Sequence, residues 1–279
     1  MIKLPAPQLN AVEVFNDCVR GFASAELREK FFSVSADFYS SFKEYSQKAS
    51  AAELHGFRAC AHGGREQRIN GEITKGDLYA LYNSQMVPEG CAGRSHYNLL
   101  MISAPLNKCP YCGIGRVSTL DHYLSKSRYP AFAVLPENLV PACADCNKVK
   151  GGGVFEADSA TLHPYFEPVA IFRECWLKAE VHNQSPVVVS FKVIPPHAWE
   201  EALKKRIVNH FEDFELARRF SVEAASEIAS IEAIFQIMHG PEDKKTHVAN
   251  TAQAEFRLNS NSWKAAMYSA LSKSDWFFV

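Results

Sequence analysis

The chain has 279 residues, so it is longer than one typical domain, and 47 % of them are hydrophobic, which is enough for a sizeable core. It carries 30 basic residues against 31 acidic ones, a net charge of −1. This balance argues against a protein that binds nucleic acid through its overall charge.

Two helices are predicted within residues 8–50, because two sets of apolar side chains recur there at helical spacing. Aromatic residues dominate both sets, which is typical of a core or a partner surface, and a platform for stacked bases is the alternative. The two sets are Val12, Phe15, Val19 and Phe22, then Leu27, Phe31, Val34, Phe38 and Phe42.

Residues 56–76 are predicted to form a basic, glycine-rich surface loop. A mobile linker and a contact loop for nucleic acid or a partner both fit this composition. A metal site at His55, Cys60 and His62 is disfavoured by the poor ligand spacing.

Two short helices are predicted next. Thr74 is the expected N-cap of the first helix, with Asp77 at its third position. The second helix is expected from Ser95 to about Ser103 and leads directly to Cys109.

Four cysteines form two Cys-x-x-Cys pairs, and the second pair begins 31 residues after the first ends. Two such turns complete a tetrahedral Zn²⁺ site, which is closed and therefore structural. A redox pair or four buried thiols are the alternatives. The long intervening loop is expected to hold structure of its own, with zinc helping it to fold. The predicted ligands are Cys109, Cys112, Cys143 and Cys146.

Residues 118–124, Ser-Thr-Leu-Asp-His-Tyr-Leu, have the composition of a short strand. Neighbours on a strand point to opposite faces, so Asp121 and His122 could do different jobs, one holding a metal and the other facing a substrate. A helix is expected to start at Asn147, and strand, loop and helix would bring these three residues together.

The pattern Cys-x-x-Cys, Asp-His, Asn-Leu-Val, Cys-x-x-Cys-Asn, Lys strongly resembles the zinc-knuckle HNH endonucleases, which have a ββα-metal core. The resemblance implies that His122 is the general base and that Asp121 is a ligand of a catalytic divalent ion. It implies that Asn138 pins the loop and helps to orient the base. Asn147 then becomes the second protein ligand of the ion, in a position where Asn is a common variant of His.

The chemistry agrees with these roles. A His that titrates near neutral pH can deprotonate water. A hard cation held by a carboxylate and an amide oxygen can clamp the scissile phosphate and the leaving oxygen. The expected cofactors are structural Zn²⁺ and catalytic Mg²⁺ or Mn²⁺, with Ni²⁺ as a further substitute.

The resemblance covers about residues 78–168, and it adds contacts for the substrate. Residues 116–150 hold five basic residues against three acidic ones, a modest footprint that leaves much of the nucleic-acid affinity to a partner. His163 lies in a His-Pro-Tyr motif and is either an accessory site residue or a packed core residue. The candidate phosphate contacts, with solvated surface charges as the alternative, are Arg94, Lys126, Arg128, Lys148 and Lys150.

The last third of the chain is predicted to begin with a hairpin and to continue as helices. The strand at 187–194 pairs with one near 176–182. Helices are expected at about 197–217, 221–239 and 246–273. The apolar tail at 276–279 should dock in the core or in a partner.

The other cysteines, Cys18, Cys60, Cys91 and Cys175, are expected to be free thiols, mostly buried. Thiolates committed to a metal fit a reducing cytoplasm. With no signal peptide and no apolar run long enough for a bilayer, we expect a cytoplasmic protein without membrane contact.

We therefore predict an α+β, mainly helical protein with a zinc-stapled ββα-metal core. Its parts are N-terminal helices at 1–75, the nuclease core at 76–170 and a strand-plus-helices domain at 171–279. The implied reaction is hydrolysis of DNA. Bacterial HNH proteins of this kind resemble subunits of anti-phage defence systems, including Septu and retron-linked ones, that work beside an ATPase. The alternatives are a zinc-stapled binding or scaffold module and an HNH nuclease acting on RNA.

Overall fold

The computed structural model describes all residues except the side chain of Asp158. Its architecture is helix-rich α+β, and the described strands form three small two-stranded sheets. The chain forms two compact units, Ile2–Glu167 and Pro168–Val279 with Met1. The predicted boundary at residue 75 thus lies inside the first unit, and the predicted core 76–170 extends three residues beyond the end of that unit. None of the described helices has the length and apolar character needed to cross a bilayer.

The first unit begins with three helices, where two were predicted: α1 (Ala11–Arg20), α2 (Ala25–Ser33) and α3 (Ser35–Ser50). The helical conformation is interrupted at Val34, with φ −117° and ψ 12°. The aromatic side chains are buried against one another, and the ring of Phe15 packs on Phe31, Phe38 and Phe42. The aromatic side chains of the two predicted sets are therefore part of the core.

The predicted loop 56–76 contains a small hairpin, β1 (Arg68–Asn70) with β2 (Ile73–Thr74). Sequence composition missed it because Lys75, buried at 1 % exposure, organises the loop: its ammonium group donates to the carbonyls of Ala61 and Gly63. The capping box at Thr74 and Asp77 is confirmed at the start of α4 (Lys75–Asn83). α5 covers Arg94–Met101.

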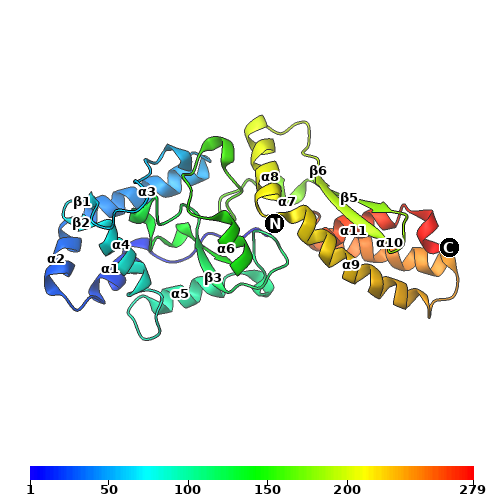
Figure 1. The fold of residues 1–279 in the computed structure, drawn as a ribbon, viewed down its shortest axis with the longest axis horizontal. Coiled ribbons are helices and arrows are strands. Elements are labelled where there is room, and N and C mark those ends of the chain that lie inside the picture. Colours follow the sequence, from blue (N-terminus) through cyan, green and yellow to red (C-terminus); the bar gives the residue numbers. More distant parts are fainter. The chain divides into compact units, whose positions relative to one another are not determined.

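The zinc-knuckle segment contains β3 (Thr119–His122), β4 (Leu139–Ala142) and α6 (Ala144–Lys150). The strands pair antiparallel, with His122 opposite Leu139. α6 lies beside β3 (Figure 1) and packs on it. The helix starts three residues before the predicted Asn147, because Cys143 takes the N-cap position and accepts a hydrogen bond from the amide of Cys146.

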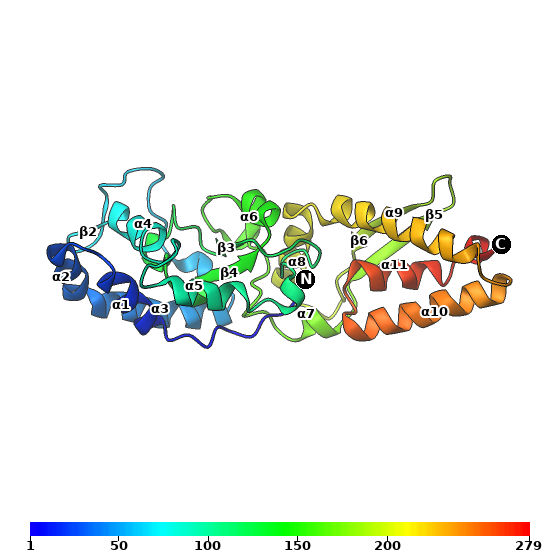
Figure 2. The ribbon, with the colours of Figure 1, turned by 90° about the horizontal axis from the view of Figure 1, so that it is seen from below.

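The second unit holds a hairpin and five helices among its described residues. The hairpin β5 (Leu177–His182) with β6 (Val188–Val193) confirms the predicted strands. α9 packs on β6 and α11 on β5 (Figure 2). The helices are α7 (Ala170–Arg173), α8 (Glu201–Asp213), α9 (Leu216–Phe235), α10 (Pro241–Leu258) and α11 (Trp263–Leu271).

The single helix predicted at 246–273 is wrong, since α10 ends at Leu258 and α11 starts at Trp263. Asn259 is extended, and Ser262 caps α11. Asn261 in the break accepts hydrogen bonds from the amides of Trp176 and Leu177, at 2.9 and 3.2 Å. The break thus ties the helices to the start of β5.

Short 3-10 turns complete the fold. The last of them carries the apolar tail, in which Phe277 and Phe278 are buried, as predicted, while Val279 is exposed. The turns are Leu54–Gly56, Pro105–Asn107, Pro130–Phe132, Pro136–Asn138, Ala157–Ser159 and Asp275–Phe278.

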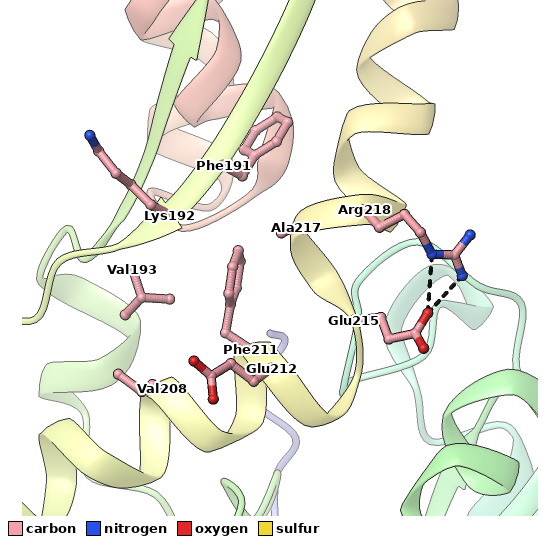
Figure 3. Close-up of a pocket in the computed structure, with 9 residues that line it drawn as sticks. All are labelled: Phe191, Lys192, Val193, Val208, Phe211, Glu212, Glu215, Ala217 and Arg218. Atoms are coloured by element: carbon pink, nitrogen blue, oxygen red, sulfur yellow. Dashed lines mark hydrogen bonds and ion pairs between the residues drawn. The ribbon is translucent and has the colours of Figure 1, made fainter.

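A cleft of about 490 Å³ lies where α8 and the start of α9 face β6 (Figure 3). Its rim includes Glu215 and Arg218, whose charged groups pair at 2.7 Å. None of the predicted site residues lines it. Its apolar lining residues include Phe191, Val193, Val208 and Phe211.

Candidate metal centre

Four cysteine side chains meet in the first unit. Cys109 and Cys112 lie in the turn before β3, Cys143 caps α6 and Cys146 lies in its first turn. All four are buried, and their sulfurs lie within 4.8 Å of one another. The Sγ atoms of Cys112 and Cys143 are 3.9 Å apart, and a tetrahedral zinc with ~2.3 Å bonds requires about 3.8 Å. The four cysteines therefore suit one metal ion and are consistent with structural zinc.

Backbone amides stabilise the charge of these sulfurs. The amide of Gly115 donates to Cys112 Sγ at 3.3 Å, and that of Cys146 donates to Cys143 Sγ at 3.5 Å. The turn is closed by a bond from the Cys109 amide to the Gly115 carbonyl at 2.8 Å. Hydrogen bonds of this kind to metal ligands orient the ligands and tune the affinity of the site for its metal.

Gly115→Ala is expected to weaken zinc binding, because a Cβ atom at this position would lie 2.7 Å from the Sγ and Cβ of Cys143. The matched control is Gly153→Ala, whose Cβ would meet nothing within 4 Å. Competition with a chromogenic zinc chelator should show at least a ~10-fold loss of affinity for Gly115→Ala. Equal zinc affinity in both variants would contradict the close approach.

Asp121 and His122 point to opposite sides of β3, as the sequence predicts. The carboxylate of Asp121, which is 3 % exposed, accepts a hydrogen bond from Tyr111 Oη at 2.7 Å. Lys150 Nζ lies 3.0 Å from the same oxygen, Oδ2. Burial lowers the pKa of Lys150, and the neighbouring Asp121 carboxylate opposes that shift.

His122 is held through its ring. Nε2 lies 2.9 Å from the carbonyl oxygen of Ala133, and a carbonyl only accepts, so Nε2 carries the hydrogen and Nδ1 of the neutral ring is the acceptor. Burial, and then the charge of Lys126, lowers the pKa of His122 to about 3. The ring is therefore neutral at neutral pH, and the expected titration near neutral pH is not found, because the ring is buried. Tyr82 packs on it with the ring centroids 4.5 Å apart.

Asn138 is fully buried and fixes the loop that follows β3. Its Nδ2 donates to the carbonyls of Leu124 and Phe132 at 3.0 and 3.1 Å, and its Oδ1 accepts from the Leu124 amide at 2.7 Å. The carbonyl that holds His122 belongs to the residue after Phe132. Asn138 thus pins the segment that orients the His122 ring.

Asn147 is half-buried on α6, three residues before Lys150. Residues three apart share one face of a helix, so the face that brings Lys150 to Asp121 also carries Asn147. Oxygen atoms of a carboxylate and an amide form a donor set for a hard divalent cation.

The candidate phosphate contacts differ in their surroundings. Lys148 is exposed, while Lys126 donates to Asn83 at 2.8 Å. Arg94 is engaged by Glu89 at 2.7 Å and by the carbonyl of Val87.

Two more of these candidates are turned inward. Lys150 donates to the carbonyls of His122 and Tyr123, at 2.7 and 2.6 Å, as well as pairing with Asp121. Those three contacts use every hydrogen of its ammonium group, which leaves none for a phosphate. Arg128 is half-buried, and its Nε is buried without a hydrogen-bond partner.

His163 lies in the core at 2 % exposure, which fits the packed alternative. Its ring centroid is 3.9 Å from that of Tyr123, and its Nε2 is 3.3 Å from Tyr45 Oη.

Of the other free cysteines, only Cys18 is buried, so the expectation that most of them are buried is wrong. Burial raises the pKa of the Cys18 thiol to about 12, which makes it unreactive. Cys60, Cys91 and Cys175 are half-exposed.

Sequence reasoning missed three contacts of the site. Tyr82 covers His122, and Tyr111 and Lys150 hold Asp121. For Tyr111 the sequence did offer a signal: it lies between two metal-binding cysteines, and a bound metal would fix its backbone.

Comparisons with known proteins place the chain in a family. No protein-family model matches it, and no solved structure does. Protein ea31 of Escherichia phage lambda is 30 % identical over 296 residues, which cover 100 % of this chain and 99 % of ea31. The chain belongs to the ea31 family. A partial similarity links this ea31-family chain to the Septu protein PtuB of Bacillus thuringiensis, at 33 % identity over 64 residues, 21 % of this chain and 25 % of PtuB.

Proposed function

We propose that this ea31-family protein is a metal-dependent HNH endonuclease that hydrolyses DNA phosphodiester bonds. The observation that carries the proposal is the pairing of His122 Nε2 with the Ala133 carbonyl, because it leaves Nδ1 as a fixed acceptor. The antiparallel pair β3–β4 followed by α6 supports it further, since that is the element order of a ββα-metal core.

In the proposed mechanism His122 is the general base. Its Nδ1 takes the proton of a water that attacks the phosphorus. Asp121 and Asn147 would hold Mg²⁺ or Mn²⁺, which supplies charge stabilisation for the phosphate and the leaving oxygen. Asn138 keeps the loop in place so that the base does not turn away. Zinc on the four cysteines has a structural role.

A partner is the second part of the proposal. Lys148 is the one exposed side chain among the five candidate phosphate contacts, so the nuclease core alone offers a small basic surface. The resemblance to HNH subunits of Septu and retron-linked systems, together with the partial similarity to a Septu protein, favours an effector of anti-phage defence that works beside an ATPase.

Two alternatives differ from this proposal in measurable ways. A zinc-stapled binding or scaffold module would bind nucleic acid or protein without hydrolysing anything. An HNH nuclease for RNA would have the same site and a different substrate, and no stacking motif in the sequence favours it.

The test is cleavage of supercoiled plasmid by the zinc-loaded protein. We expect nicked or linear product with Mg²⁺ or Mn²⁺ and none with chelator present, and little cleavage of RNA in the same buffer. The ATPase encoded beside the gene, where there is one, is added in a parallel reaction. Intact plasmid in every reaction would favour the binding module, and preferential loss of RNA would favour the RNA nuclease.

A further inference from the structure

We propose that Tyr111 couples the zinc centre to the divalent-ion site by fixing the carboxylate of Asp121. Tyr111 is then a positioning residue that acts through Asp121. The inference rests on the proposed function, because it assigns Asp121 to the catalytic ion.

Tyr111 stands between two of the zinc-binding cysteines. Cys109 and Cys112 flank it closely, so zinc fixes the backbone from which its side chain departs. The side chain is fully buried, and its hydroxyl reaches Asp121 Oδ2 at 2.7 Å. A bond of this length to a carboxylate is a strong one.

Both partners of Asp121 use the same oxygen. Lys150 Nζ lies 3.0 Å from Oδ2, where Tyr111 also donates. Among the described residues no hydrogen bond uses Oδ1 of Asp121. Oδ2 is thus the anchored oxygen, and we infer that Oδ1 is the one presented to a cation.

The anchoring has a direct consequence for metal binding. A buried carboxylate with only one fixed oxygen has a fixed plane, so Oδ1 keeps one direction as an ion arrives. Outer contacts of this kind change metal affinity by 10–100-fold when they are removed. The same dependence makes the catalytic ion sensitive to zinc, because loss of zinc releases the turn that carries Tyr111.

The test compares Tyr111→Phe with Tyr268→Phe. Tyr268 is a close match in the second unit: it donates to Glu227 Oε1 at 2.8 Å, and Lys264 Nζ donates to the same oxygen at 2.9 Å. Each substitution removes one hydroxyl from a Tyr–carboxylate–Lys group and keeps the ring. Zinc content is measured by elemental analysis, and Mn²⁺ affinity by calorimetry and by electron paramagnetic resonance.

We expect Tyr111→Phe to retain one zinc per chain and to bind Mn²⁺ at least ~10-fold more weakly than the wild type. Tyr268→Phe should bind Mn²⁺ like the wild type. Wild-type Mn²⁺ affinity in Tyr111→Phe, with zinc in place, would overturn the inference. A thermal unfolding curve for each variant separates a lost ion site from a lost fold.

Wild-type protein gives a second measurement that needs no substitution. Zinc-free chains that bind Mn²⁺ fully would contradict the coupling. Failure of the proposed function looks different: the wild type would then neither bind Mn²⁺ nor cleave DNA. If the wild type cleaves DNA and Tyr111→Phe binds Mn²⁺ as the wild type does, only the coupling is rejected and the proposed function stands.

Discussion

His122→Ala is expected to lower DNA cleavage by about 10²–10⁴-fold, the range for loss of a general base. The reason is geometric: Nδ1 of His122 is the acceptor left over when Nε2 donates to the Ala133 carbonyl. Alanine removes the base and leaves the zinc cysteines and Asp121 untouched. The measurement is the initial rate of plasmid nicking in Mn²⁺, at equal zinc content.

The control for this substitution is His182→Ala. His182 is half-buried and hydrogen-bonded to Ser190 at 2.8 Å in the second unit, so it tests for general effects of losing a histidine. We expect it to cleave at the wild-type rate. Full activity in His122→Ala would reject His122 as the base, and equal loss in both variants would point to damaged folding.

The sequence was most informative where chemistry depends on close spacing. Two Cys-x-x-Cys pairs predicted a four-sulfur site, and the four buried sulfurs meet within 4.8 Å. The Thr74 capping box is likewise encoded within four residues, and it formed as predicted. The capping residues, and the two cysteines within each pair, are three positions apart, so the pattern can be recognised without tertiary information, although the two pairs lie 31 residues apart.

Contacts between distant residues were not predictable in the same way. Asn261 ends a predicted helix because its amide binds the start of β5, about 85 residues away in sequence. Lys150 was predicted to contact phosphate, with a solvated charge as the alternative, and only the packing of α6 on β3 turns it toward Asp121. Helical periodicity predicts neither contact, since each depends on which distant residue the side chain meets in the folded protein.

The second large effect concerns zinc itself. Removing it, by chelation or by the double substitution Cys143→Ser with Cys146→Ser, is expected to unfold the unit Ile2–Glu167 and to leave Pro168–Val279 folded. Structural zinc contributes about 10–16 kcal/mol in small zinc-binding peptides, and a domain is stable by only ~5–15 kcal/mol. Here zinc joins the turn before β3 to the start of α6, so its loss frees the end of the β3–β4 pair at which Thr119 lies opposite Ala142.

The chain provides a built-in way to tell the two units apart. All four tryptophans lie in the second unit, at Trp176, Trp199, Trp263 and Trp276, whereas both units contain helices. After chelation we expect a large loss of far-ultraviolet circular dichroism with little change in tryptophan emission. Cys175→Ser, a half-exposed cysteine outside the cluster, is the matched control and should behave like the wild type. Unchanged circular dichroism in protein shown to be zinc-free would mean that the apolar core of the first unit holds β3, β4 and α6 together without the metal.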